Sequence, residues 1–469
     1  MGDELHYKSA EELARLIATR KLSPVEVVEA QVQRIEQAEG ALNSYITLLA
    51  EEALKEAGQA ERVVMAGESL GPLHGVPVAV KDIIHARGVR TTAGSRIMSD
   101  FVAQEDATVV ERMRAAGAIL MGKLNCHEFA FGATGTNPHY GNPCNPWDIS
   151  RITGGSSGGS GAATAAGLAA LTLGTDTGGS VRIPSALCGI AGLKTTFGRV
   201  SRYGVIPLSW SLDTVGPMTR TVKDAALLLG VIAGKDERDS FTSSRPVPDY
   251  VQALDGDIKG VRVGVIREYF FDGLAPEVES AVTEAIDVLE RLGAELEEVS
   301  FPRIEETVAA STLILSAEGS AYHERYLRTR PQDYGADVRE RFELGRMLLA
   351  TDYVNAQRLR AVVSRQYAEL MERVDVLVTA VCPIAAPRQG ELFVDLDGEE
   401  QDVRTVLSRL TRPFNVVGAP ALNLPCGFTS EGLPLGFQVA GKLLDEATVL
   451  RVGHAYEQAT PWHRRRPPA

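Results

Sequence analysis

The segment between Gly154 and Gly204 is built largely of small residues, and it constrains the fold more than any other part of the chain. It contains two glycine–serine runs, Gly-Gly-Ser-Ser-Gly-Gly-Ser at 154–160 and Thr-Asp-Thr-Gly-Gly-Ser at 175–180. The alanines between them predict a tightly packed helix (Ala162, Ala163, Ala165, Ala166, Ala169 and Ala170). Because glycine adds no side chain, the backbone N–H groups of such loops can converge on a bound group.

Short apolar segments alternate with helical patterns along much of the chain. Buried strands are predicted at 75–80, 119–122, 261–266, 294–299 and 375–379, and helices at 106–116 and 276–292. The N-terminal part has a helical pattern, with capping boxes that begin at Ser9 and Ser23. This alternation predicts an α/β fold with a central mixed β-sheet flanked by α-helices.

The length of the chain raises the question of domain number. With 469 residues, of which 44% are hydrophobic, it can bury a large core and exceeds the usual size of one domain. However, we find no internal repeat or low-complexity linker, and the polar stretch 236–246 is too short to separate domains. We expect one large domain over 1–469, with a helical N-terminal segment 1–65, a core at 70–220, and a substrate-side and C-terminal part at 221–469.

Charge and cysteine content exclude several classes of protein. The formal net charge of −13 and the pI of about 5.3 argue against unaided binding to nucleic acid or to an anionic membrane. Five widely spaced cysteines without a Cys-x-x-Cys pair indicate reduced thiols and give no zinc signature. The sequence shows no signal peptide and no apolar run long enough for a transmembrane helix. We expect a cytoplasmic protein without a metal or a cofactor.

A lysine at the end of an apolar strand adds a third part to a candidate catalytic site. Lys81 follows Val78, Ala79 and Val80, so we expect it in the interior, where desolvation favours the neutral amine. A serine hydroxyl is a poor nucleophile until a base removes its proton, and a neutral lysine can be that base. Together with the glycine–serine runs, Lys81 predicts an acyl-transfer site that uses neither histidine nor metal.

These motifs resemble those of the amidase signature family of serine hydrolases. The similarity is dense from about Leu73 to Met218, returns at 432–438, and includes Gly-Leu-Lys-Thr-Thr-Phe-Gly-Arg-Val-Ser at 192–201 and Ser-Leu-Asp-Thr-Val-Gly-Pro at 211–217. It implies that Ser180 is the nucleophile, that Ser156 in a cis peptide relays the proton, and that Lys81 is the general base. It also implies an oxyanion hole of backbone N–H groups (Thr177, Gly178, Gly179 and Ser180) and an acyl pocket in the stretch 130–134 (Ala130, Phe131 and Gly132).

Other interpretations of these residues are less well supported. A glycine–serine loop before a helix can bind phosphate, but the chain has neither a Gly-Lys-Ser/Thr ending nor a Gly-x-Gly-x-x-Gly motif. None of the eight histidines stands in a serine-hydrolase motif, which argues against a Ser-His-Asp triad. Asp176 and Arg182 flank the candidate nucleophile, and we expect them to hold the loops by hydrogen bonds.

The specific reaction depends on a few further residues. One family member, which is the glutaminase component of the glutamyl-tRNA amidotransferase, works with a tRNA-binding partner, and the chain resembles it around Tyr203 and Gly204. That glutaminase holds the amino group of glutamine with an aspartate, and the matching position here is Ser408. Arg360 resembles its carboxylate-binding arginine, although a structural role is the stronger expectation.

Because Ser408 carries no charge, the sequence favours a stand-alone hydrolase that cleaves the C–N bond of a small amide, anilide or carbamate, or an ester. The expected partner is a small-molecule amide substrate, with no direct contact to nucleic acid or membrane, and with a homodimer as an open option. The alternative is the glutaminase component of a tRNA-dependent amidotransferase complex.

Overall fold

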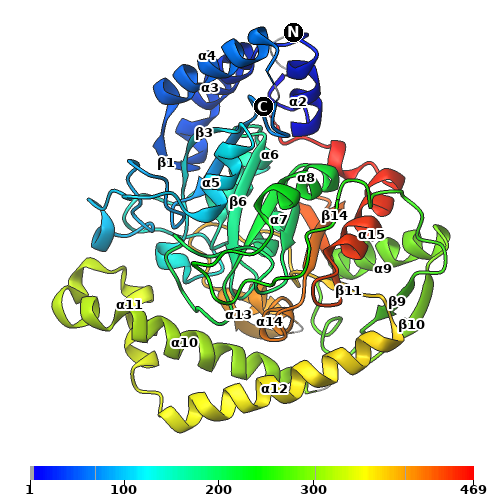
Figure 1. Ribbon diagram of the computed structural model, residues 1–469. Coiled ribbons are helices and arrows are strands. Elements are labelled where there is room, and N and C mark those ends of the chain that lie inside the picture. Colours follow the sequence, from blue (N-terminus) through cyan, green and yellow to red (C-terminus); the bar gives the residue numbers. More distant parts are fainter. Residues whose placement is uncertain (1–4, 69, 302, 397, 469) are drawn as a thin grey trace.

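The apolar segments pair into one mixed sheet of eleven strands among the residues that the computed structural model describes, 5–68, 70–301, 303–396 and 398–468. In spatial order (Figure 1) the strands are β1 (Tyr45–Leu48), β3 (Ile119–Leu124), β2 (Pro77–Lys81), β6 (Leu171–Asp176), β8 (Thr214–Thr219), β7 (Ala191–Lys194), β14 (Ala421–Phe428), β15 (Pro434–Gly441), β11 (Val376–Ala380), β9 (Arg262–Val265) and β10 (Glu295–Glu298). Two small antiparallel pairs lie apart from it, β4 (Cys144–Asn145) with β5 (Asp148–Ile152), and β12 (Phe393–Leu396) with β13 (Glu399–Asp402).

The sheet has two groups of parallel strands joined by an antiparallel middle, and the edge strand β1 pairs antiparallel with β3. Strand β2 pairs parallel with β3 and β6, and β9 pairs parallel with β10 and β11. Between these groups, β8, β7, β14 and β15 continue the sheet through antiparallel pairs. Every residue of β2, β3, β6 and β8 is buried, including Lys81, Lys123 and Asp176, so both faces of these strands are covered.

Helices surround this sheet and extend beyond it at two opposite ends (Figure 1). At one end lie α2 (Ala10–Ala18), α3 (Pro24–Leu42) and α4 (Ala50–Ala66), and at the other α10 (Ile304–Thr329), α11 (Ala336–Gly345) and α12 (Ala350–Arg373). The remaining helices are α5 (Thr108–Ala115), α6 (Gly158–Ala165), α7 (Arg182–Cys188), α8 (Val222–Ile232), α9 (Pro276–Arg291), α13 (Val403–Ser408), α14 (Arg412–Val416) and α15 (Glu446–Ala459).

The predicted fold class, an α/β domain with a mixed sheet flanked by helices, is confirmed. The expected strands correspond to β2, β3, β9, β10 and β11, and the expected helices to α5 and α9. Ser9 caps α2, and Ser23 forms a complete capping box with Glu26 at the start of α3. The division into 1–65, 70–220 and 221–469 remains a proposal.

Candidate active site

Lys81 is the last residue of β2, and its side chain is fully buried. Its Nζ atom donates hydrogen bonds to Ser156 Oγ at 2.7 Å and to Thr175 Oγ1 at 2.9 Å. Thr175 lies on β6, which runs parallel to β2, so the carboxyl ends of both strands meet at the same edge of the sheet. The candidate base therefore faces the loop that follows β6.

Burial is the main influence on the charge of Lys81. Desolvation lowers the pKa of its ammonium group from the ordinary value to about 8, against the opposing influence of Cys126, Asp213 and Asp176. In the described ranges no carboxylate forms an ion pair with Lys81. Its neighbour Asp82 pairs instead with Lys123, at 3.0 Å. Lys81 is thus a buried lysine that loses its proton close to neutral pH.

Ser156 lies at a cis peptide bond with Gly155, just before α6. A side chain at position 155 has no room, because a Cβ atom there would be 2.5 Å from the backbone nitrogen of Gly135. The next residue, Ser157, donates its N–H to the carbonyl oxygen of Ser180 at 3.2 Å. The structure thus brings the loops of Ser156 and Ser180 together, although no hydrogen bond joins their hydroxyl groups in the described part of the chain.

Ser180 ends the glycine loop between β6 and α7. Gly179 has a φ of 124°, and a Cβ atom there would be 2.2 Å from Thr411 Oγ1, so only glycine fits. Its N–H group donates to Asp176 Oδ1 at 2.8 Å. Of the predicted oxyanion donors, Gly179 therefore already has a partner, and the N–H groups of Thr177, Gly178 and Ser180 are the ones left for a ligand.

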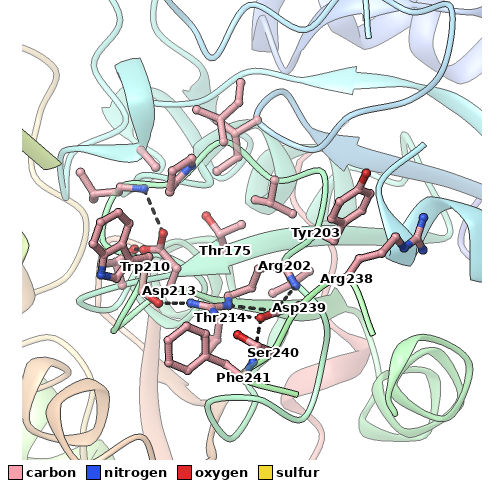
Figure 2. A pocket seen from close by; sticks show the side chains of 18 residues that line it. Thr175, Arg202, Tyr203, Trp210, Asp213, Thr214, Arg238, Asp239, Ser240 and Phe241 are labelled. Atoms are coloured by element: carbon pink, nitrogen blue, oxygen red, sulfur yellow. Dashed lines mark hydrogen bonds and ion pairs between the residues drawn. The ribbon is translucent and has the colours of Figure 1, made fainter. Parts of the chain in front are cut away.

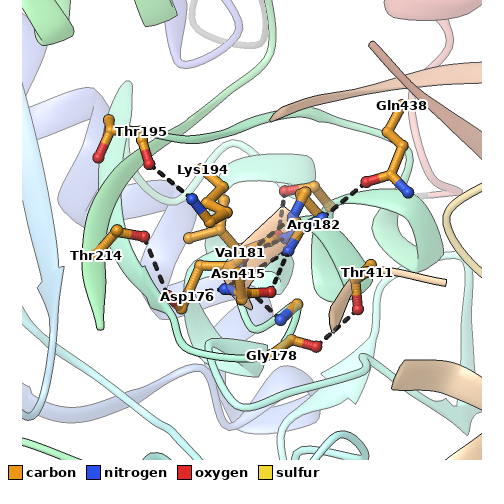
Figure 3. Close-up of polar contacts among 12 residues, drawn as sticks. Asp176, Gly178, Val181, Arg182, Lys194, Thr195, Thr214, Thr411, Asn415 and Gln438 are labelled. Carbon is orange, nitrogen blue, oxygen red and sulfur yellow. Dashed lines mark hydrogen bonds and ion pairs between the residues drawn. The ribbon is translucent and has the colours of Figure 1, made fainter. Parts of the chain in front are cut away.

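Asp176 and Arg182 form the buried support of this loop (Figure 3). The Asp176 carboxylate accepts from Arg182 Nε at 3.0 Å and from Asn415 Nδ2 at 2.8 Å, besides the N–H of Gly179. Arg182 Nη1 in turn donates to Gln438 Oε1 at 2.8 Å. Burial alone would raise the pKa of the Asp176 carboxyl, but Arg182 and the hydrogen bonds outweigh it and hold that pKa well below its usual range. The expectation that both residues hold the loops is confirmed.

The residues of the predicted acyl pocket lie beside Ser180. Ala130, Phe131 and Gly132 line a cavity of about 60 Å³ together with Thr177, Gly178 and Ser180. Position 132 must be glycine, because a Cβ atom would be 2.2 Å from the ring of His127. Leu208, Leu315 and Ile183 add apolar walls.

Three arginines that the sequence did not single out also line this cavity, namely Arg341 on α11, Arg404 on α13 and Arg412 at the start of α14. Ser408 lies among them. Arg360, in contrast, does not line this cavity and donates to the backbone oxygens of Val416 and Ser211.

A second cavity, of about 240 Å³, is lined by Thr175, whose hydroxyl accepts a hydrogen bond from Lys81 (Figure 2). Asp213 also lines it, as do Trp210 and Phe241 at its rim. Asp213 accepts a hydrogen bond from Thr177 Oγ1 at 2.6 Å, and burial raises the pKa of its carboxyl to about 6. The two cavities share Ala130, Thr177 and Leu208. Asp213 was predicted only as part of the motif at 211–217, and not as a residue of the site.

In the described ranges no three His, Cys, Asp or Glu side chains are grouped as metal ligands would be. None of the described helices combines the length and the apolar character needed to cross a membrane.

Comparison with known proteins gives close matches over the whole chain. The chain is 45% identical to the A subunit of the glutamyl-tRNA(Gln) amidotransferase of Chloroflexus aggregans, covering 99% of both sequences. Among solved structures, it matches the protein of the same name from Thermotoga maritima with a TM-score of 0.82 and 34% identity, covering 97% of this chain and 96% of that one. It also matches a protein described as part of a vestigial complex that reveals the evolutionary origins of an s-triazine catabolic enzyme, with a TM-score of 0.94 and 37% identity, covering 98% of this chain and 100% of that one.

These matches correct two predictions. The prediction of a stand-alone hydrolase that cleaves a small amide, anilide, carbamate or ester is wrong. Relatives 42–45% identical over nearly the whole chain are named as part of an amidotransferase. The expectation of an enzyme without nucleic acid or partner protein, with a homodimer as an option, is wrong for the same reason. Both predictions rested on the uncharged Ser408.

The resemblance on which the roles of the site residues rest is itself confirmed. The sequence profile described as Amidase matches residues 26–450. Solved structures that match include a bacterial aryl acylamidase of the amidase signature family, with a TM-score of 0.90 and 28% identity over 98% of this chain and of that one. This chain therefore belongs to the amidase signature family of enzymes.

Proposed function

We propose that this chain is the amide-cleaving component of a tRNA-dependent amidotransferase, which takes ammonia from the side-chain amide of glutamine. The observation that carries the proposal is the 42–45% identity, over 97–99% of the chain, to proteins named as the A subunit of glutamyl-tRNA(Gln) amidotransferase. A cytoplasmic location, where tRNA is charged, belongs to the same proposal.

In the first step, Ser180 Oγ attacks the amide carbonyl carbon. Its proton passes to Ser156 Oγ, whose own proton passes to the neutral Lys81, 2.7 Å away. The carbonyl oxygen becomes an oxyanion, which accepts hydrogen bonds from the backbone N–H groups of Gly178 and Ser180. Asp176 fixes that loop through Gly179, and so acts as a positioning residue.

In the second step, the C–N bond breaks and the relay returns a proton to the departing nitrogen, which leaves as ammonia. The acyl group stays on Ser180 as an ester. Water then attacks this ester with the same base, and the acyl group leaves as a carboxylate while Ser180 regains its proton. This sequence requires Lys81 to alternate between neutral and protonated forms, for which a pKa of about 8 is suitable.

The test compares the chain alone with the chain in complex with the tRNA-binding partner protein. We expect ammonia release from glutamine to be low for the isolated chain and to rise at least about tenfold in the complex. Ser180→Ala should abolish both ammonia release and labelling by a fluorophosphonate, whereas Ser150→Ala, at an exposed position on β5, should leave both unchanged. Full glutamine turnover without a partner would contradict the proposed role in a complex.

A further inference from the structure

Positive charge is concentrated at the acyl cavity. Arg341, Arg404 and Arg412 come from three different helices, and all three line both the cavity at Ser180 and an adjoining cavity of about 330 Å³. Two of them have a carboxylate partner on their own segment, since Arg341 pairs with Asp337 at 2.6 Å and Arg404 with Asp402 at 2.9 Å. Neither partner lines the cavity at Ser180.

Arg412 is the exception. No carboxylate of the described chain is within ion-pair distance of its guanidinium, whose Nη1 donates to the hydroxyl of Thr312. Its side chain packs against the loop of Ser180, with Cγ at 3.6 Å from the place where a Cβ of Gly178 would lie. Burial and the nearby charge of Arg341 lower its pKa, as expected for a cation without a counter-ion. A half-buried cation in this state is stabilised when a ligand brings a negative charge.

The same cavity offers no free carboxylate to a cation among the described residues. Its lining at Ser180 contains no aspartate or glutamate among the described residues, and the only carboxylate of the adjoining cavity, Asp402, is engaged with Arg404. The Ser408 hydroxyl, moreover, donates to the backbone oxygen of Arg404 at 2.8 Å. The ammonium group of an amide donor would therefore meet guanidinium groups of the same charge rather than a carboxylate.

We infer that the acyl pocket selects amide donors by a carboxylate and disfavours an ammonium group, so that its preferred substrates are half-amides of dicarboxylic acids without an amino group. The apolar walls of Leu208, Leu315 and Ile183 suit the methylene chain between the amide and the carboxylate. The inference deepens the proposed function, on which it rests for the position of the amide at Ser180. Glutamine remains a weaker donor, held by its carboxylate alone.

Binding to the Ser180→Ala protein tests this without turnover. Calorimetry compares glutaramate, which is glutamine without its amino group, with L-glutamine and with 5-methylhexanamide, in which an isopropyl group replaces the carboxylate. We expect glutaramate to bind about 10- to 100-fold more tightly than either of the other two, the usual size of a charge-assisted contact. Equal binding of the neutral amide, tightest binding of glutamine, or no binding of glutaramate would each overturn the inference.

Variants identify the residues responsible. Arg412→Leu should remove most of the preference for glutaramate, while Arg412→Lys should retain part of it. Arg339→Leu is the matched control, because Arg339 is a partly exposed residue of α11 outside both cavities. If Arg412→Leu fails to fold, as judged by circular dichroism, Arg404→Gln replaces it with the same expectation.

The converse change is Ser408→Asp, which should tighten glutamine binding at least about tenfold and weaken that of glutaramate. An unchanged order of affinities in both Ser408→Asp and Arg412→Leu would overturn the inference. Ammonia release by the wild-type complex is measured separately, so a failure of the proposed function appears there and not in the binding series.

Discussion

At the scale of single residues, two buried lysines show how the surroundings set the state of a side chain. Lys123 lies beside Asp82 and forms an ion pair with it, whereas the Nζ of Lys81 has only hydroxyl groups within hydrogen-bond distance among the described residues. The sequence predicted burial of Lys81 from the apolar residues before it. It did not predict that the adjacent Asp82 forms an ion pair with Lys123, because that contact depends on the pairing of β2 with β3.

The pH dependence of acylation should report the proton on Lys81. The base is active only when neutral, so labelling of Ser180 by a fluorophosphonate should rise with pH through about 8 and level off above that value. Below it the rate should fall about tenfold per pH unit. The Lys81→Met variant should be labelled at least about 10²-fold more slowly, and its labelling rate should no longer change around pH 8. A labelling rate that stays constant through this range would contradict the role of Lys81.

Asp176 should contribute strongly to stability. Asp176→Asn leaves the buried Arg182 without a counter-ion, and we expect a loss of about 3–5 kcal/mol in the free energy of unfolding, measured with urea. Because the pKa of Asp176 is depressed in the folded state, its contribution is present above the unfolded pKa of about 3.9 and fades as the pH falls below it.

The difference between wild type and Asp176→Asn should therefore shrink in acid. Asp287→Asn, an exposed position on α9, serves as control and should change stability by less than about 0.5 kcal/mol. A loss for Asp176→Asn no larger than that of the control would show that the network does not stabilise the fold.

At the scale of elements, the predictions succeeded where a pattern is local. Strand β2 is apolar up to Lys81 and β9 is apolar after Arg262, and α9 has a clear amphipathic period and ends before Gly293. The cavity arginines could not be predicted in the same way. Arg341 stands on a polar helix, whereas Arg404 and Arg412 stand on short helices that are mostly buried. The three arginines meet only because α11, α13 and α14 converge on the loop of Ser180.

The close packing of α6 predicts how a substitution in this helix changes the stability of the protein. Every residue of α6 is buried, and a Cβ atom on Gly159 would lie 2.4 Å from the backbone oxygen of Ser44. Gly159→Ala should therefore destabilise the protein by about 1–3 kcal/mol, although alanine favours a helix. Gly58→Ala in α4, where a Cβ atom meets nothing within 4 Å, should instead stabilise by about 0.5–1 kcal/mol. Thermal unfolding shows whether each variant is more or less stable than the wild type. A change in the same direction for both variants would contradict this view of the packing.

At the scale of the whole molecule, the sheet joins parts of the chain that are far apart in the sequence. The three residues of the proposed relay, Lys81, Ser156 and Ser180, all lie within 70–220, whereas Asn415 and Gln438, which hold Arg182, belong to the C-terminal part. Strand β7 pairs with β14, and the buried Lys194 donates to the backbone oxygen of Ala419 at 2.6 Å. We propose on this basis that the segments 1–65, 70–220 and 221–469 fold as one cooperative unit.

This cooperativity can be tested by dividing the chain. A fragment of residues 1–220 keeps Lys81, Ser156 and Ser180 but loses β14, so β7 exposes an unpaired edge and Arg182 loses two of its partners. We expect the fragment to show no labelling by a fluorophosphonate and no cooperative unfolding transition. Co-expression with the fragment 221–469 should restore both, because the missing strand and side chains return. Labelling of the isolated fragment at the rate of the full chain would show that the N-terminal part is an independent catalytic domain.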